Sequence, residues 1–423
     1  MIKKISVALF LLFSIVSLAQ QGTSSPYSFY GIGDIRFRGT AENRLMGGIS
    51  VFPDSIHINI QNPASYSSLK LTSYTVGASF NSTRLNSFKN NEKAQRSTLD
   101  YMAVGIPLKK MGFGFGLIPY SSVGYRIRNE KTSISIIDGT STTIIKRNEG
   151  TGGLNKIFLG FGYKVNTNLS IGADIHYNFG KIETKNIEKI SDVELGTQEY
   201  NSSELSGVNV NLSAMYQRKF NNKLDVYGSL IYTPESTLTS KNKRITSSVI
   251  YSDYFDPQDV DQFDEIKTTY TIKLPSKIIF GLGIGQSKKW MVGTELTFQQ
   301  NSKFGNRTED ISNVIYRDVV KYSLGGYFIP NYSAYSNYFK KITYRGGFRY
   351  ENTGMMINNQ KLRDYAFSAG LGLPLGGVFS NLNIGVEYGR RGTAKALLIE
   401  ENYTNVILSL SLNDRWFIKR KYD

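Results

Sequence analysis

The sequence predicts an all-β fold, a transmembrane antiparallel up-and-down β-barrel of about 14 strands with an N-terminal hatch in the lumen. Three observations support this prediction. The first 19 residues resemble a secretion signal, segments of alternating apolar and polar residues follow from about residue 70, and short and long connections alternate between these segments. We therefore expect the protein to lie in the bacterial outer membrane.

The N-terminus has the three parts of a signal peptide. Lys3 and Lys4 are basic, residues 5–16 are apolar, and Ser17 and Ala19 provide small residues for cleavage. The apolar run is shorter than the roughly 20 residues that a membrane-spanning helix needs. We expect residues 1–19 to be a signal peptide; the alternative is a short buried helix at the terminus.

The composition limits the chemistry. The chain has 28 Tyr, 24 Phe and 40 Gly but no Cys, and its only histidines are His57 and His176. These numbers suit a sheet with aromatic residues at a membrane interface and leave little material for a metal site or a histidine-based catalytic relay. We expect no enzyme activity, no cofactor and no metal site.

The formal net charge is +16, and many basic residues form pairs near expected strand ends, as in Lys109-Lys110 and Lys288-Lys289. This pattern favours outer-membrane lipid headgroups over nucleic acid as the partner, because it lacks interleaved groups for base stacking or readout. A solvated basic surface is the alternative for any single pair.

Alternation with period two defines the strands. In residues 169–179, Leu169, Ile171 and Ile175 share one face, while Asp174 and His176 share the other. The same pattern gives fourteen strands, at 71–84, 96–107, 111–126, 153–165, 168–182, 205–219, 223–237, 268–286, 289–301, 319–331, 341–352, 362–375, 380–392 and 401–413.

The connections alternate in length. The shorter set is 108–110, 166–168, 220–222, 287–288, 332–340 and 376–379; the longer set is 85–95, 127–152, 183–204, 238–267, 302–318, 353–361 and 393–400. Short periplasmic turns and long extracellular loops are typical of outer-membrane barrels and place both termini in the periplasm. A soluble β-sandwich is the alternative.

Residues 20–69 do not alternate. They are rich in Gly and turns, including the runs Met46-Gly47-Gly48 and Asn62-Pro63-Ala64 just before the first strand. We expect a compact hatch inside the lumen, followed by a barrel over residues 70–413 and a basic periplasmic tail over residues 414–423. Asn62-Pro63 also suits a simple turn.

These runs, together with Gly112-Phe113-Gly114-Phe115-Gly116 and Pro119 in the third strand, resemble the FadL family of outer-membrane fatty-acid and hydrocarbon channels. The resemblance implies that the N-terminal segment plugs the lumen and that a kink in strand three opens the wall sideways. The hatch would include Met46, Gly47, Gly48, Asn62, Pro63 and Ala64; the lateral opening would include Gly112, Gly114, Gly116 and Pro119.

A proline within a closed barrel removes a ladder donor, which agrees with a lateral opening at Pro119. A plain bulge or a strand end is the alternative. The expected lumen also carries charges that an apolar channel would not need: Asp174, Glu295, Arg345, Arg349 and Glu387. We expect these charges to hold the hatch, since buried charges need partners.

Two further polar groups have simple interpretations. Asp174 and His176 are expected to join a lumen hydrogen-bond network rather than a catalytic pair. The acidic residues between Asp253 and Glu265 lack the Gly and spacing of a calcium loop, so a solvated loop is expected, with weak divalent binding as the alternative.

Two functions are consistent with the sequence. One is a passive uptake channel for a small hydrophobic ligand with lateral exit. The other is a non-transporting accessory barrel docked to a large outer-membrane protein complex, as PorV-like barrels of this fold are in the type 9 secretion translocon.

Overall fold

The computed structural model describes residues 22–88, 90–134, 141–220, 224–252, 256–306, 313–334, 337–375 and 380–416. The expected signal peptide lies outside these residues, as do the last seven residues of the expected tail. The expected turn at 376–379 and most of the one at 220–222 also lie outside them.

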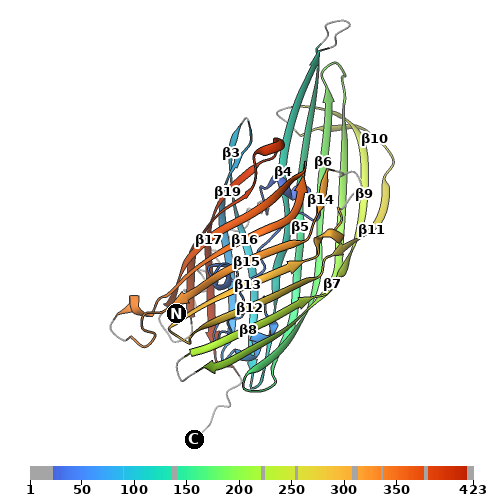
Figure 1. Ribbon diagram of the computed structural model, residues 1–423. Helices are drawn as coiled ribbons and strands as arrows, with labels where there is room; N and C mark the ends of the chain where they lie inside the picture. The colour runs from blue at the N-terminus through green and yellow to red at the C-terminus, as the bar shows by residue number, and fades with distance from the viewer. Residues whose placement is uncertain are drawn as a thin grey trace, which may run out of the picture.

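The strands form one closed antiparallel sheet (Figure 1). Their bounds are β1 (Asp34–Ile35), β2 (Thr72–Asn86), β3 (Asn91–Leu108), β4 (Met111–Ile134), β5 (Ser141–Lys164), β6 (Leu169–Ile190), β7 (Gly196–Phe220), β8 (Leu224–Thr233), β9 (Ser236–Ile250), β10 (Gln258–Gln262), β11 (Ile266–Leu274), β12 (Lys277–Gln286), β13 (Trp290–Gln299), β14 (Val314–Tyr316), β15 (Val319–Phe328), β16 (Thr343–Ile357), β17 (Gln360–Leu375), β18 (Ser380–Gly392) and β19 (Glu400–Asp414). Pairing of β19 with β2 closes the barrel.

The prediction of 14 strands is confirmed. Three barrel strands are interrupted, so that β8 and β9, β10 to β12, and β14 and β15 each form one strand of the wall. The breaks between β8 and β9 and between β11 and β12 lie at Pro234 and Pro275, which lack the N–H that a ladder needs. The uninterrupted strands expected at 223–237 and 268–286 are therefore corrected to broken ones.

Several expected long loops are largely strand. The β4–β5 ladder continues to Ile134 opposite Ser141, and β6 and β7 pair as far as Glu188 opposite Thr197. The 353–361 loop is reduced to a two-residue turn. These extensions carry many polar residues and so lack a clear period-two signal, although Ile187, Met356 and Ile357 are buried in them. Cross-strand hydrogen bonds satisfy their backbones. Figure 1 shows the β4–β5 and β6–β7 hairpins projecting beyond the rest of the wall.

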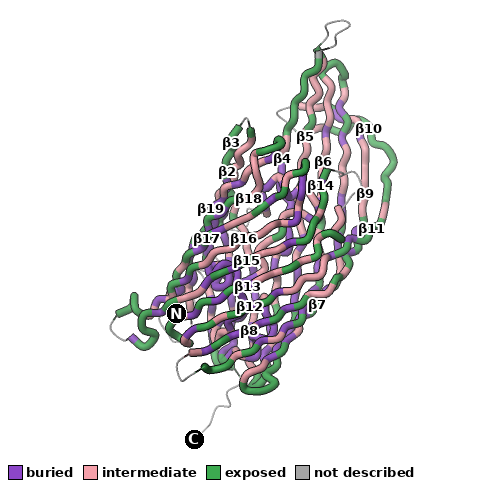
Figure 2. Tube along the Cα trace, in the orientation of Figure 1, coloured by how far each residue is buried: buried purple, intermediate pink, exposed green. Residues whose placement is uncertain are grey.

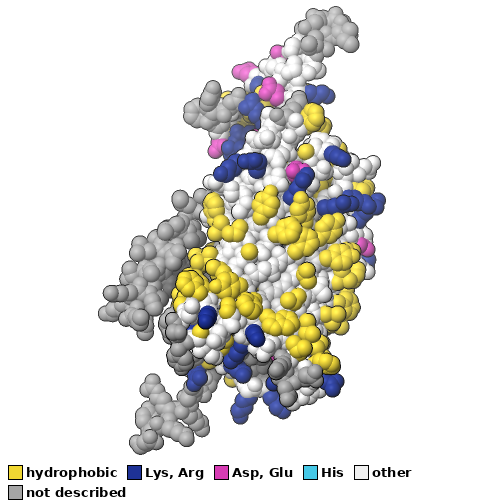
Figure 3. Space-filling view, turned by 60° about the vertical axis from the view of Figure 1, so that its left-hand side comes forward, with side chains coloured by type: hydrophobic (Ala, Val, Ile, Leu, Met, Phe, Trp, Pro, Cys, Tyr) yellow, Lys and Arg dark blue, Asp and Glu magenta, His cyan; other side chains and the backbone are white. Residues whose placement is uncertain are grey.

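The outer face of the barrel is apolar where the strands alternate. Figure 2 shows exposed and buried residues alternating along the strands, and Figure 3 shows hydrophobic side chains gathered over the wall. Ile175, Leu282 and Val292 expose 53%, 66% and 49% of their surface. Such a face is stable only against lipid, because a water-soluble protein rarely exposes so large an apolar patch.

The N-terminal segment, residues 22–71, lies inside the barrel. It contains η1 (Pro26–Phe29), β1, α2 (Ala41–Arg44) and η2 (Pro63–Ser68); further short helices are η3 (Asn301–Lys303), η4 (Tyr338–Lys341) and η5 (Lys395–Leu397). Leu45, Ile49 and Tyr66 have no exposed surface. None of the helices in the described ranges is long and apolar enough to span a bilayer.

A closed barrel of this size is expected to keep its fold in cold detergent. We predict that unboiled and boiled samples migrate differently in denaturing gels, because hydrogen-bonded ladders close the wall around the barrel and unfolding must break many of them together. Identical migration under both conditions, or recovery of the native protein from the soluble fraction, would contradict a membrane barrel.

The two ends of the barrel are expected to face opposite sides of the membrane. Because the chain has no Cys, Asp261→Cys in β10 and Lys110→Cys in the β3–β4 turn would each carry a unique thiol. An impermeant maleimide applied to whole cells should label Asp261→Cys and leave Lys110→Cys unlabelled until the outer membrane is broken. The opposite pattern would reverse the orientation.

Candidate functional site

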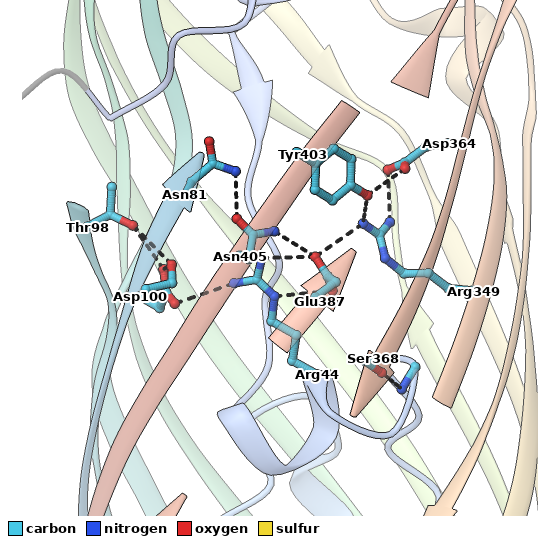
Figure 4. Close-up of polar contacts among 12 residues, drawn as sticks. Arg44, Asn81, Thr98, Asp100, Arg349, Asp364, Ser368, Glu387, Tyr403 and Asn405 are labelled. Atoms are coloured by element: carbon cyan, nitrogen blue, oxygen red, sulfur yellow. Dashed lines mark hydrogen bonds and ion pairs between the residues drawn. The ribbon is translucent and has the colours of Figure 1, made fainter. Parts of the chain in front are cut away.

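Arg44, at the end of α2, joins the N-terminal segment to the wall. Its guanidinium lies 3.1 Å from Glu387 on β18 and 3.5 Å from Asp100 on β3 (Figure 4). Asp100 also accepts hydrogen bonds from Ser79 and Thr98. A single side chain of the segment thereby contacts β18 and β3, which lie on either side of the β19–β2 pair that closes the barrel.

The ion pair continues along the wall. Glu387 accepts from Asn405 and lies 3.7 Å from Arg349 on β16, which donates to Asp364 at 2.9 Å and to Tyr403 at 2.6 Å. We call the residues Arg44, Asp100, Arg349, Asp364, Glu387, Tyr403 and Asn405 the Arg44 network. Each charge has a partner of opposite sign, which offsets the cost of burying it.

Other contacts fix the N-terminal part and the middle of the segment. Asp34 of β1 pairs with Arg391 at 2.5 Å, and Ser25 donates to Glu401 at 2.5 Å. Further along the segment, the backbone N–H and the hydroxyl of Ser50 both donate to Glu295, at 2.6 and 2.9 Å. The segment is therefore held by wall carboxylates at three levels of its path.

The lumen charges singled out from the sequence have different roles. Glu295 and Glu387 contact the segment directly, whereas Arg349 reaches it only through Glu387. Arg345 donates to Asn383, whose amide donates to Glu42 of α2. Asp174 lies 3.7 Å from His176 and faces the side chain of Tyr66 in η2.

The residues expected in the hatch all lie against the wall or in the core of the segment. Gly47 has a positive φ of 70°, and its N lies 2.0 Å from where a Cβ on Gly347 would stand. The N–H of Ala64 donates to Ser213 at 2.7 Å, and Met46, Gly48, Asn62 and Pro63 are buried. Only glycine permits so close an approach of two backbones.

The glycines of β4 have a different place from the one expected. Gly112, Gly114 and Gly116 lie where β4 is still paired with β3, so they do not line a gap in the wall. A Cβ on Gly112 would stand 1.9 Å from the carbonyl oxygen of Tyr66, and one on Gly114 would stand 2.8 Å from its ring. These two glycines make room for η2.

The wall does separate beside Pro119. The β3–β4 ladder ends at Met102 opposite Leu117, while β4 stays paired with β5 across a bulge between Pro119 and Ser121. Beyond this point β1 takes the place of β3, pairing Asp34 and Ile35 with Ser122 and Ser121. The proline therefore marks both a bulge and the start of a gap that the N-terminal segment partly covers.

His57 and Asp54 form a further pair within the segment, at 2.9 Å. Burial alone would lower the pKa of His57, but the carboxylate of Asp54 outweighs it and raises that pKa above its ordinary value. In turn His57 outweighs the effect of burial on Asp54 and lowers its pKa to about 2. The pair is thus stabilised in its charged form.

The acidic residues near β10 are engaged in ordinary contacts. Asp259 accepts hydrogen bonds from Ser247 and Gln198, and Glu265 pairs with Lys243 and Lys267. Asp253 lies outside the described residues. In the part of the chain that the structure covers, no group of three His, Asp or Glu side chains could hold a metal ion.

Between the segment and the wall lies a cavity of about 340 Å³. Charged side chains of both signs line it. The basic ones are Arg36, Arg38, Arg44, Arg96, Lys156, Lys277, Lys321, Arg349 and Arg391, and the acidic ones are Asp34, Asp100, Glu295, Glu351, Asp364, Glu387 and Glu401. Sequence reasoning missed most of these. The basic residues of the wall could have been identified from the alternation of the strands. Lys156, for example, is next to Ile157, which faces outward, so Lys156 must face the lumen.

The fold has solved counterparts. The toluene transporter TodX of Pseudomonas putida has a TM-score of 0.59 at 15% identity, covering 91% of this chain and 99% of that one. The toluene transporter TbuX of Ralstonia pickettii has a TM-score of 0.56 at 14% identity, covering 90% of this chain and 99% of that one. A Pseudomonas aeruginosa FadL homologue has a TM-score of 0.57 at 12% identity, covering 92% of this chain and 100% of that one. The expected FadL-type outer-membrane barrel is confirmed.

No curated protein matches the sequence. A family model, by contrast, covers the whole of it: the model of the BamG family matches residues 1–423. This chain therefore belongs to the BamG family.

Proposed function

We propose that this barrel is a non-transporting accessory subunit of the β-barrel assembly (BAM) machine of the outer membrane. The match to the BamG family over residues 1–423 carries the proposal, because the family name refers to a component of that machine. It favours the accessory-barrel hypothesis over the hydrophobic channel and replaces the type 9 translocon with BAM as the larger assembly.

The lumen supports this proposal. The wall carboxylates Glu401, Glu387 and Glu295 hold the N-terminal segment at three levels, and charged side chains line the remaining cavity. A site for an apolar molecule is lined mainly by hydrophobic and aromatic groups, since a bound hydrocarbon would leave these charges without water or counter-ions. The interior is suited to rigidity rather than to hydrocarbon passage.

The extended hairpins provide surface for a protein partner. Strands β4 to β7 have 22 to 25 residues, and their ends project beyond the barrel (Figure 1). About 10 residues suffice to cross the bilayer in a tilted strand. The remaining length has no role in spanning the membrane and forms a sheet that is available for docking.

The test is isolation of the tagged full-length protein from native membranes in a mild detergent. We expect the central BAM barrel to co-purify in stoichiometric amount, and depletion of this protein to lower the levels of other outer-membrane barrels. Shortening the β4–β5 hairpin should reduce that co-purification. A lone barrel carrying hydrocarbon, with normal levels of other barrels after depletion, would contradict the proposal.

One observation favours the channel as the second candidate, namely the gap between β3 and β4 beside Pro119. Pro119→Val restores a ladder donor and a β-favouring side chain, and so should help close this gap. In a channel the change would abolish uptake of a labelled arene; in an accessory subunit we expect no effect on BAM co-purification and no arene uptake even by the wild type. Wild-type uptake lost in Pro119→Val would establish the channel.

A further inference from the structure

Four basic side chains from four separate elements meet in the lumen cavity. Arg38 comes from the N-terminal segment, Lys156 from β5, Lys277 from β12 and Lys321 from β15. We call these four residues the basic cluster. Lys277 lies close enough to the other three to be repelled by all of them. A gathering of like charges from distant parts of the chain is costly unless a counter-charge is present.

The contacts of the basic cluster are mainly with aromatic rings. Arg38 and Lys156 lie 5.4 and 4.4 Å from the ring centre of Tyr120, and Lys321 lies 5.9 Å from that of Phe37. Among the described residues none of the four forms an ion pair with a carboxylate, whereas Arg44, Arg349 and Arg391 each do. Lys156 is only 6% exposed.

The nearby carboxylates do not balance the basic cluster. Glu295 is the acceptor for two hydrogen bonds from Ser50, and Asp174 acts on Lys156 only from a distance, as Glu351 does on Lys321. A buried ammonium group without a paired anion is unfavourable, and ring faces compensate for only part of the lost hydration. Other carboxylates line the same cavity, but none of those in the described residues is in direct contact with the basic cluster, which therefore lacks a paired counter-charge.

We propose that this cavity binds a phosphate group, either of a small phosphorylated solute or of a lipid headgroup. Three ammonium groups and one guanidinium supply the point charges and the planar donor pair that suit the tetrahedral oxygens of phosphate. The volume of about 340 Å³ accommodates a small phosphorylated group. The Arg44 network lines the same cavity, but its charges are already paired with one another. The site is separate from the partner surface proposed above.

The test uses the full-length protein in a neutral detergent and isothermal titration with inorganic pyrophosphate. We expect saturable binding that weakens with added salt, and a loss of at least about tenfold in affinity in Lys277→Met/Lys321→Met, because charged hydrogen bonds are removed. The matched control, Lys110→Met/Lys219→Met, removes two exposed lysines near strand ends and should bind like the wild type. Retained heat-modifiable migration shows that each variant is folded.

A second arm distinguishes the sources of the phosphate group. Short-chain phosphatidic acid is titrated in the same way. Tighter binding of phosphatidic acid than of pyrophosphate would identify a lipid headgroup as the ligand, and tighter binding of pyrophosphate would identify a soluble ligand. Lys277→Arg/Lys321→Arg should retain binding in either case, because the charge remains. Absence of saturable binding of both probes, or equal affinity in the wild type and the double Met variant, would overturn the proposal.

Discussion

Glu387→Gln is expected to loosen the N-terminal segment and to lower the stability of the barrel. The carboxylate of Glu387 is 3% exposed and is shared by Arg44 of the segment and Arg349 of the wall. Removing one member of a buried ion pair typically costs about 3–5 kcal/mol, because the remaining charge is left without compensation. Asp100 and Asp364 still face the two arginines, so we expect the lower end of that range.

Denaturant unfolding in detergent gives the loss of stability, and limited proteolysis of folded protein gives the release of the segment. We expect faster cleavage between residues 22 and 71, together with higher conductance in planar bilayers. Arg44→Met in the same chain should restore part of the stability, because the unpaired guanidinium is then removed as well. Equal stability of wild type and Glu387→Gln would show that the network does not hold the segment.

Gly112→Val is expected to displace η2 from its place against β4. The new Cβ would stand 1.9 Å from the carbonyl oxygen of Tyr66 and 3.1 Å from the N of Ser67, so backbone must move rather than a flexible side chain. Overpacking of this kind costs about 1–3 kcal/mol or more. The cost falls on the segment, because the β3–β4 ladder itself accommodates a branched residue.

The matched control is Gly228→Val. Gly228 lies in a strand of the same wall, but a Cβ there would meet no atom within 4 Å. We expect Gly112→Val to expose the segment to protease while heat-modifiable migration persists, and Gly228→Val to behave like the wild type. Similar protease resistance in both variants would mean that η2 does not need its close contact with β4.

The membrane strands could be predicted because successive residues of a barrel wall face lipid and lumen in turn, so apolar and polar residues alternate along each strand. The segment from Leu169 to Phe179 is an example: Ile171 and Ile175 face lipid, whereas Asp174 and His176 face the lumen. The extended hairpins could not be predicted in this way. Near Ile134 both faces of the hairpin are exposed, so the sequence there is polar whether it forms a strand or a loop. Around Glu188 only an isolated apolar residue, Ile187, is buried, which is too little to give a periodic signal.

The residues of the candidate site could likewise be predicted only in part. The alternation placed Glu295, Arg345, Arg349 and Glu387 in the lumen, but it contained no information on which wall residue each segment residue would meet. Arg44 and Glu387 are separated by 343 positions, and Gly112 approaches Tyr66 rather than a gap in the wall. Pro119 was identified by its own chemistry, since a residue without an N–H disturbs a ladder wherever it stands.

The sequence by itself determined the barrel, its strand number and the inward or outward direction of most wall residues, because these depend on local period-two patterning and on the bilayer as a fixed solvent. Only the tertiary structure decided which charges are paired. Each charge of the Arg44 network is paired with an opposite charge, whereas the basic cluster has no paired carboxylate. The difference arises because Arg38 and Arg44 of one segment meet strands from different parts of the chain. Such pairing depends on distances across the lumen, which no local pattern specifies.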